Sequence, residues 1–232
     1  MQTTKLIIFD CDGTLVDSQH LIAESMRLAF IGLDLPPPSR QAILRTVGLS
    51  IPEAVYTLAS QLGEAARNSL AQSYRAWCQS LRQQPEMQEP MFRGASGLMM
   101  DLAAQENIIL GLATGKSRRG VDRFLAQNDL KGIFATIQTA DTAPSKPDPS
   151  MIEQAMHETG ATPAETVMIG DTSYDMIMAR MAGVNSIGVL WGHHSLTELK
   201  RAGAKRIVKS FAELKLALLS DGVSAERHSE AA

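Results

Sequence analysis

Short apolar runs recur along the chain and predict buried strands. They are rich in Ile, Val and Leu, and stretches long enough for one helix separate most of them. The predicted strands are residues 5–9, 108–113, 133–137, 166–169 and 186–190. The helices expected between them are residues 117–127, 149–159 and 173–181. This alternation indicates an α/β fold, in which a Rossmann-like, doubly wound parallel sheet is joined by right-handed crossovers.

One long gap interrupts the alternation. Residues 10–107 separate the first two predicted strands, which is far more than one crossover helix needs. Amphipathic patterns at about residues 21–30, 51–62 and 64–81, with proline-rich breaks at 36–38 and 85–90, predict a small all-helical inserted domain. No second insertion fits between residues 114 and 146. The expected division is a core of residues 1–15 and 90–220, a helical cap of residues 16–89, and a disordered tail of residues 221–232.

Composition narrows the possible partners. The 232 residues are 44% hydrophobic, and 22 Lys and Arg against 25 Asp and Glu give a net charge of -3. This balance offers no basic surplus for a nucleic acid. The apolar run near the N-terminus is too short for a signal peptide or a membrane span, and Cys11 and Cys78 form no disulfide or zinc pattern. We expect a cytoplasmic protein that binds a small molecule, without a nucleic acid or membrane partner, as a monomer or a homodimer.

Polar segments follow the predicted strands, at the sheet edge where open α/β folds bind ligands. They are residues 10–14, 114–116, 145–148 and 170–175. Carboxylates gathered at one edge repel one another unless their pKa values rise or a cation joins them. Mg²⁺ fits this site, with the side chains of Asp10 and Asp171 and the backbone carbonyl of Asp12 as its ligands. Asp175, one helical turn after Asp171 and on the same face, would bind the ion directly or through water. The expected metal-binding residues are Asp10, Asp12, Asp171 and Asp175.

The same segments could carry out phosphoryl transfer, which mainly requires positioning and charge stabilisation. Asp10 would attack phosphorus, and Asp12, on the same side of the strand, would protonate the leaving oxygen and later activate water. Lys146 would supply positive charge, and the Thr114 hydroxyl would hold the phosphate together with backbone amides. The expected catalytic residues are Asp10, Asp12, Thr114 and Lys146. The residues expected to bind phosphate or substrate are Cys11, Gly13, Thr14, Arg45 and Gly115.

Together the four segments resemble the motifs of the haloacid dehalogenase-like superfamily. DxDGT begins at Asp10, a strand ends in Thr114, a lysine follows at Lys146, and GDxxxD ends at Asp175. The strings DCDGTLVDS, ATGKS, SKPDPSM and GDTSYDMIMA are most similar to phosphoglycolate phosphatases whose helical cap follows the first motif. The resemblance spans about residues 5–220. It implies a magnesium-dependent phosphatase that forms an aspartyl phosphate on Asp10, with 2-phosphoglycolate as the leading substrate.

Several alternatives remain open at this point. Asp12 argues against the haloacid dehalogenases and the phosphonoacetaldehyde hydrolases of the superfamily, and Thr14 favours a phosphatase, because phosphoglucomutases usually carry Val there. A β-phosphoglucomutase-like sugar phosphomutase, a pyrophosphatase and a nucleotidase are still possible. A non-catalytic module that binds a phosphate ligand is the alternative from another class, although no motif residue is missing.

Other polar residues allow a structural and a functional interpretation. Arg45, with Gly48, could reach an anionic group on the substrate, although an arginine on an amphipathic helix is more often solvated. Asp17 and Ser18 could cap the first helix of the cap or take part in substrate binding, and they are hinge candidates. The adjacent His193 and His194 are expected to be exposed in a loop and not to bind a metal.

Overall fold

The core of the protein is a six-stranded parallel sheet. The computed structural model describes residues 4–220. The strand order is β3-β2-β1-β4-β5-β6, and every neighbouring pair is parallel. The strands are β1 (Lys5–Phe9), β2 (Ile108–Thr114), β3 (Thr136–Thr139), β4 (Thr166–Gly170), β5 (Asn185–Val189) and β6 (Arg206–Val208). The order reverses next to β1, and such a switch point opens a crevice beyond the carboxyl ends of the strands.

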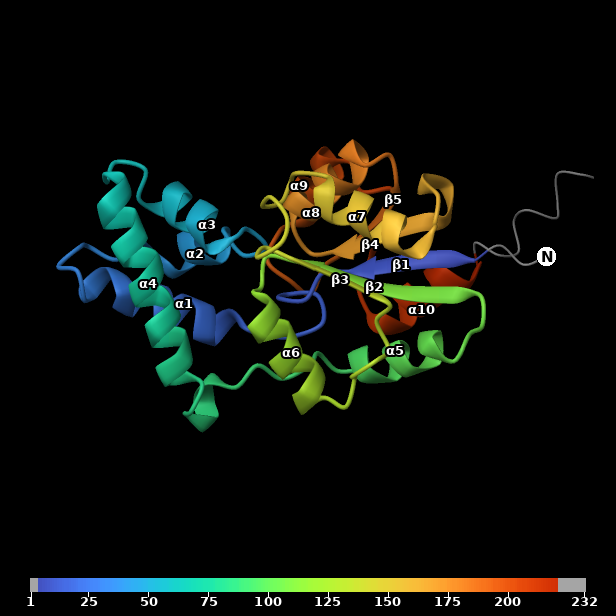
Figure 1. The fold of residues 1–232 in the computed structure, drawn as a ribbon, viewed down its shortest axis with the longest axis horizontal. Coiled ribbons are helices and arrows are strands. Elements are labelled where there is room, and N and C mark those ends of the chain that lie inside the picture. Colours follow the sequence, from blue (N-terminus) through green and yellow to red (C-terminus); the bar gives the residue numbers. More distant parts are fainter. Residues whose placement is uncertain (1–3, 221–232) are drawn as a thin grey trace, which may run out of the picture.

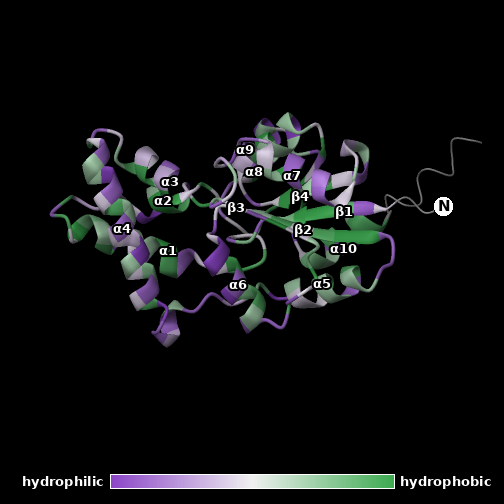
Figure 2. Cartoon of the chain, in the orientation of Figure 1, coloured by the Kyte–Doolittle hydropathy of each residue, from purple (hydrophilic) through white to green (hydrophobic). Residues whose placement is uncertain are grey.

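Helices cover both faces of the sheet, as the doubly wound prediction requires (Figure 1). In β1, Ile7 and Phe9 pack into one apolar cluster while Leu6 and Ile8 pack into another, because successive side chains of a strand point to opposite faces. The first cluster is covered by α5 (Ala95–Ala103), α6 (Arg118–Gln127) and α10 (Phe211–Ser220). The second lies under α7 (Ser150–Thr159) and α8 (Ser173–Met181), with α9 (Leu196–Ala202) beside α8. Figure 2 shows the central strands β1 and β2 as strongly hydrophobic. The α/β prediction is confirmed.

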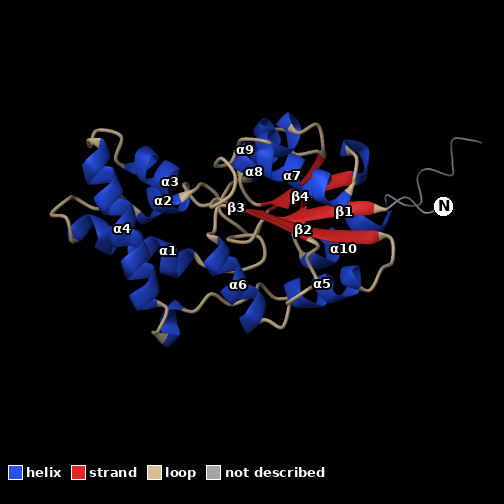
Figure 3. Cartoon of the chain, in the orientation of Figure 1, coloured by secondary structure: helices blue, strands red, loops and turns tan. Residues whose placement is uncertain are grey.

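A helical insertion between β1 and β2 forms the cap. It consists of α1 (Gln19–Ile31), α2 (Arg40–Leu44), α3 (Ile51–Leu58) and α4 (Glu64–Leu81), and it contains no named strand in the described residues (Figure 3). An apolar cluster that includes Met26, Phe30 and Leu70 belongs to the cap alone. The cap lies beyond the carboxyl ends of the strands, over the switch point (Figure 1).

Two connections join the cap to the core, and they run side by side. The backbone N–H of Asp17 donates to the carbonyl of Pro90 (2.9 Å), and the N–H of Phe92 donates to Leu15 (3.0 Å). The side chain of Asp17 accepts a hydrogen bond from the N–H of Gln19 (3.3 Å), whereas Ser18 makes no side-chain capping bond. The division of the chain at residues 16 and 89 remains a proposal.

Some predicted bounds differ from the structure. The strand placed at residues 133–137 begins at Thr136, because Ile133 and Phe134 pack against the core from the loop that precedes it. The cap helix placed at 51–62 ends at Leu58, since Ala59 leaves the helical conformation. β6, α2, α5, α9 and α10 were not among the predicted elements. The expected tail of residues 221–232 lies outside the described residues. Within residues 4–220, no helix is both long enough and apolar enough to cross a membrane.

Candidate active site

Asp10 follows β1 directly and lies fully buried at the switch point. Its backbone N–H donates to the carbonyl of Ile169 at 2.9 Å, which extends the pairing of β1 with β4 by one residue. The Nζ atom of Lys146 lies 2.7 Å from Oδ1 of Asp10 and 2.6 Å from Oδ1 of Asp175. All three side chains are inaccessible to solvent. The structure therefore brings together residues that are far apart in the sequence, as expected from the sheet topology.

Asp171 and Asp175 complete a compact acidic cluster with Asp10. One ligand atom from each of the three carboxylates lies within 4.8 Å of those of the other two. Asp175 is in the first turn of α8, where its Oδ2 accepts from the backbone N–H (3.0 Å) and the hydroxyl (2.7 Å) of Thr172. The prediction that Asp171 and Asp175 share a helix face is wrong, because α8 begins only at Ser173. Asp171 instead lies in the turn between β4 and α8.

The hydroxyl of Thr14 orients Asp171, to whose Oδ1 it donates at 3.0 Å. Thr14 was expected to bind phosphate, and the structure places its side chain on the acidic cluster instead. Gly13 has a φ of 88°, a conformation that suits glycine, and a Cβ at this position would collide with the side chains of Asp171 and His193. Cys11 is fully buried, and burial raises the pKa of its thiol, so it acts as a packing residue.

The electrostatics of the cluster are those of three buried carboxylates around one lysine. Burial raises the pKa of Asp10 to about 7; Lys146 opposes this, and Asp175 and Asp171 add to it. Burial would also raise the pKa of Asp171, but hydrogen bonds from His193 and Thr14 hold it below its ordinary value. The pKa of Lys146 is raised because its two carboxylates outweigh the effect of burial. The ionised form of Asp10 therefore needs more positive charge than Lys146 supplies.

A divalent cation fits this arrangement. Oδ2 of Asp10 is buried without a hydrogen-bond partner among the described residues, and Oδ1 is paired with the ammonium of Lys146. Buried polar atoms without partners are costly, and a metal ion would satisfy them. A donor set made only of carboxylate oxygens suits a hard cation such as Mg²⁺. The side chain of Asp12 is not part of the acidic cluster, so a role for Asp12 in metal binding rests on its backbone carbonyl.

The segment after β2, which the sequence predicts to bind phosphate, lies directly under the cap. Thr114 is buried, and its hydroxyl accepts from the N–H of Lys116 at 3.2 Å. A Cβ on Gly115 would lie 2.5 Å from the carbonyl oxygen of Leu49 and 2.6 Å from that of Gly48. Only glycine lets the loop between α2 and α3 approach this closely. The N–H of Ser50 in the same loop donates to the hydroxyl of Ser145 at 2.8 Å, so the cap contacts the core on two sides of the site.

The two histidines after β5 correct an expectation. His193 is largely buried; its backbone N–H donates to Oδ2 of Asp171 at 2.8 Å, and its Nδ1 lies 2.8 Å from the same oxygen. His194 is 6% exposed, and its Nδ1 accepts from the N–H of Ser173 at 3.0 Å. The prediction of an exposed pair is wrong, because the loop folds back over the acidic cluster. At Gly192 it passes so close to Asp171 that a Cβ would collide with it.

Arg45 lies at the surface of the contact between cap and core. Its guanidinium pairs with Glu198, its side chain is 56% exposed, and its carbonyl accepts from the hydroxyl of Tyr174 at 3.2 Å. It does not line the cavity described next. Its visible role is to hold the cap against α8 and α9.

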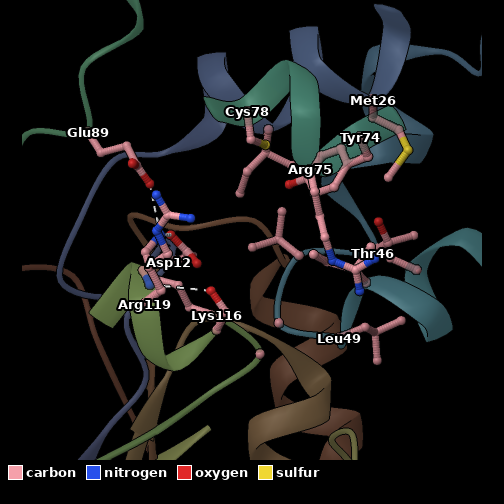
Figure 4. Close-up of a pocket in the computed structure, with 18 of the residues that line it drawn as sticks. Asp12, Met26, Thr46, Leu49, Tyr74, Arg75, Cys78, Glu89, Lys116 and Arg119 are labelled. Carbon is pink, nitrogen blue, oxygen red and sulfur yellow. Dashed lines mark hydrogen bonds and ion pairs between the residues drawn. The ribbon is translucent and has the colours of Figure 1, made fainter. Parts of the chain in front are cut away.

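A cavity of about 220 Å³ lies between cap and core, next to Asp12. Figure 4 shows its two sides: Met26, Tyr74 and Leu49 come from the cap, whereas Asp12 and Lys116 come from the core. The cavity is lined by more cationic than acidic side chains. The cationic ones are Arg75, Arg82, Lys116, Arg119 and Arg123, and the acidic ones are Asp12 and Glu89.

Sequence reasoning missed Lys116 and Glu89. The Nζ atom of Lys116 donates to Oδ1 of Asp12 at 2.7 Å and to Oε1 of Glu89 at 2.8 Å, and its side chain is 9% exposed. A lysine two residues after Thr114 was a usable signal, since the segment after β2 lies at the same sheet edge as Asp12. Nothing in the sequence marked Glu89.

Comparisons with known proteins agree with this geometry. Residues 7–189 match the family model described as haloacid dehalogenase-like hydrolase. The chain is 36% identical to "Probable phosphatase IndB" of Dickeya dadantii, over 90% of this chain and 91% of that one. It is 28% identical to a phosphoglycolate phosphatase of Pseudomonas putida, over 82% and 71% of the two chains. The crystal structure of a hydrolase from Pseudomonas syringae superposes with a TM-score of 0.81 at 28% identity, covering 96% of this chain and 99% of that one.

The matched region contains the first motif, the inserted cap and the acidic cluster, and the relatives include phosphatases. The chain belongs to the haloacid dehalogenase-like hydrolase family, as a relative of phosphatases that carries its helical cap after the first strand.

Proposed function

We propose that the protein is a magnesium-dependent phosphatase that hydrolyses a small phosphate monoester through an aspartyl phosphate on Asp10. The observation that carries this proposal is the buried carboxylate of Asp10. Its Oδ1 pairs with Lys146, its Oδ2 has no hydrogen-bond partner among the described residues, and two further carboxylates lie beside it. Burying a carboxylate in this way costs folding free energy, so a buried carboxylate of this kind indicates a catalytic or a cation-binding role. Asp10, Asp171 and Asp175 would hold the ion, together with the carbonyl of Asp12.

The reaction divides into two displacements. In the first, Asp10 attacks phosphorus and the bond from phosphorus to the ester oxygen breaks, while Asp12 gives its proton to that oxygen. In the second, water attacks the phosphorus of the aspartyl phosphate, Asp12 takes a proton from the water, and Asp10 leaves. Lys146 and the hydroxyl of Thr114 stabilise charge on the phosphoryl oxygens. Bound Mg²⁺ would supply further positive charge against the carboxylates and the phosphate.

The cap supports a choice of substrate. By covering Gly115 with the loop between α2 and α3, it excludes water from the phosphoryl group. Our leading substrate is 2-phosphoglycolate, which is supported by the named phosphoglycolate phosphatase among the relatives. The arginines that line the cavity offer partners for the carboxylate of this substrate. Since the cavity also has an apolar wall, larger phosphate esters belong in the same assay.

A panel of phosphate esters tests the proposal, assayed with Mg²⁺, with a chelator, and with Asp10→Asn. Phosphate release should require Mg²⁺ and should fall to background in the variant. Undiminished turnover by Asp10→Asn would refute the nucleophile assignment. Beryllium fluoride should bind to the carboxylate of Asp10 in a crystal of the complex, and density bonded to another residue would count against the mechanism.

A mutase is separated from a phosphatase by its product. With a hexose 1-phosphate as substrate, a phosphatase releases inorganic phosphate and free sugar. Accumulation of the 6-phosphate without free phosphate would contradict the hydrolase proposal.

A further inference from the structure

We infer that Lys116 is a positioning residue for the acid/base Asp12, and that through Glu89 it makes the placement of Asp12 depend on the docked cap. This inference rests on the proposed function. The main observation is that one buried ammonium bridges two carboxylates of different origin. Asp12 belongs to the first motif of the core, whereas Glu89 lies in the segment that returns from the cap.

The packing around Lys116 holds its side chain in place. A Cβ on Gly120, one turn along α6, would lie 2.7 Å from Cγ of Lys116 and 3.2 Å from its Cδ. The missing side chain at Gly120 therefore leaves room for the aliphatic stem, which points the ammonium at Asp12. Glycine inside a helix costs about 1 kcal/mol relative to alanine. That cost is incurred here at a position where glycine makes space for the lysine.

Glu89 connects this contact to the cap. Its Oε2 accepts from Nε of Arg82 at 2.8 Å, and Arg82 directly follows α4, the longest helix of the cap. The neighbouring Pro90 accepts the backbone hydrogen bond from Asp17, which joins the two connections. A continuous chain of ion pairs thus runs from Asp12 through Lys116 and Glu89 to Arg82. If the returning segment moved away with the cap, Lys116 would lose one of its two carboxylates.

The ion pair with Lys116 also determines which carboxylate oxygen of Asp12 remains available for proton transfer. Lys116 occupies Oδ1. Within residues 4–220, no side chain or backbone group is seen to donate to Oδ2, and Asp12 lines the cavity that would receive the leaving group. An acid must present one oxygen to the ester oxygen within hydrogen-bond reach, so a carboxylate that is free to rotate would spend less time in that geometry. Lys116 would fix this rotation through its contact with Oδ1.

A series of leaving groups tests this role. An alkyl phosphate depends on protonation of its leaving oxygen, whereas p-nitrophenyl phosphate releases a stable anion and depends on it little. We measure kcat/KM, which reports the steps up to formation of the aspartyl phosphate. Lys116→Met should lower kcat/KM for the alkyl ester by about 10- to 100-fold, and by less than about threefold for p-nitrophenyl phosphate. Lys116→Arg should restore part of the lost rate.

Three further variants make the test specific. Gly120→Ala keeps every charge but displaces the lysine stem, so it should reproduce the selective loss in a helix that alanine stabilises. Glu89→Gln should act in the same direction, and the double variant with Lys116→Met should be no worse than Lys116→Met alone, because both act on Asp12 in series. Arg118→Met is the matched control on α6, since Arg118 is exposed, pairs with Asp122 and does not line the cavity.

An equal loss on both esters, or no loss, in both Lys116→Met and Gly120→Ala would overturn the inference. That result is distinct from failure of the proposed function, which would show as an inactive wild-type protein or as full activity of Asp10→Asn. If Lys116→Met does not fold, Gly120→Ala and Lys116→Arg decide the question by the same ratio of the two substrates.

Discussion

Removing the charge of Asp10 should change how the stability of the metal-free protein depends on pH. In the folded protein the pKa of Asp10 is about 7, against an ordinary value of 3.8, because burial and the neighbouring carboxylates outweigh Lys146. Between these two values the folded state binds more protons than the unfolded state. The stability associated with Asp10 is therefore complete below the unfolded pKa and is lost as the pH rises through about 7.

The magnitude follows from the two pKa values. Their difference corresponds to about 4 kcal/mol, accumulated at about 1.4 kcal/mol per pH unit. Asp10→Asn removes this contribution, so the variant should gain about 2 to 3 kcal/mol over the wild type between about pH 5 and about pH 8. His193 also has a raised pKa and loses stability in the same direction, because Asp171 stabilises its protonated form. That contribution is present in both proteins and largely cancels in the comparison.

Chemical denaturation in the presence of a chelator, at a series of pH values, measures the difference. Asp101→Asn, which removes a carboxylate that is half exposed on α5, controls for the loss of one negative charge and should show no such slope. Added Mg²⁺ should stabilise the wild type increasingly as the pH rises, because it binds the ionised carboxylates. A difference between wild type and Asp10→Asn that is constant across the pH range would refute the described environment of Asp10.

Three other substitutions test separate contacts. Lys146→Met leaves buried carboxylates without their cation and should lower the unfolding free energy of the metal-free protein by about 3 to 5 kcal/mol, measured by denaturation; a loss below about 1 kcal/mol would contradict the buried pair. Gly115→Ala places a Cβ 2.5 Å from the carbonyl of Leu49, so kcat/KM should fall at least about tenfold while the melting temperature stays within a few degrees. An unchanged kcat/KM would show that the cap does not close in this way. His193→Asn removes the ring contact with Asp171 and should raise the Mg²⁺ dissociation constant about tenfold by calorimetry, whereas an unchanged constant would count against that contact.

The strands that could be predicted are those buried on both faces. β1 reads as a continuous apolar run because helices cover both of its sides, and its bounds were predicted correctly. β6 is only three residues long and begins with an exposed arginine, so no such run marks it. β3 was shifted because Ile133 and Phe134 are apolar for a different reason, since they fill the core from a loop. Hydrophobicity reports burial, and it identifies a strand only where burial and strand coincide.

The residues of the site also divide into those that the sequence could place and those that it could not. The segments with Asp10 and Asp175 could be grouped from the sequence, because parallel strands bring their carboxyl ends to one edge. Lys146 lies in the loop between β3 and α7, and its motif, more than its place after a strand, identified it. The contacts of His193 and Glu89 depend on the path of a loop and of a linker, and residue type alone does not give that path. Adjacent histidines are compatible with an exposed loop, and only the close passage at Gly192 places one of them on Asp171.

Two buried lysines pair with different carboxylates of the site, and only one of them contacts the segment that returns from the cap. Lys146 bridges Asp10 and Asp175, which both belong to the core, so the nucleophile keeps its surroundings whether or not the cap is docked. Lys116 bridges Asp12 and Glu89, and the second of these arrives with the segment that returns from the cap. The surroundings of the proposed nucleophile are thus set by the core alone, whereas those of the proposed acid/base are completed by the linker. On the proposed mechanism, an ester with a poor leaving group would then react efficiently only with the cap docked, which is also the state in which water is excluded from the phosphoryl group.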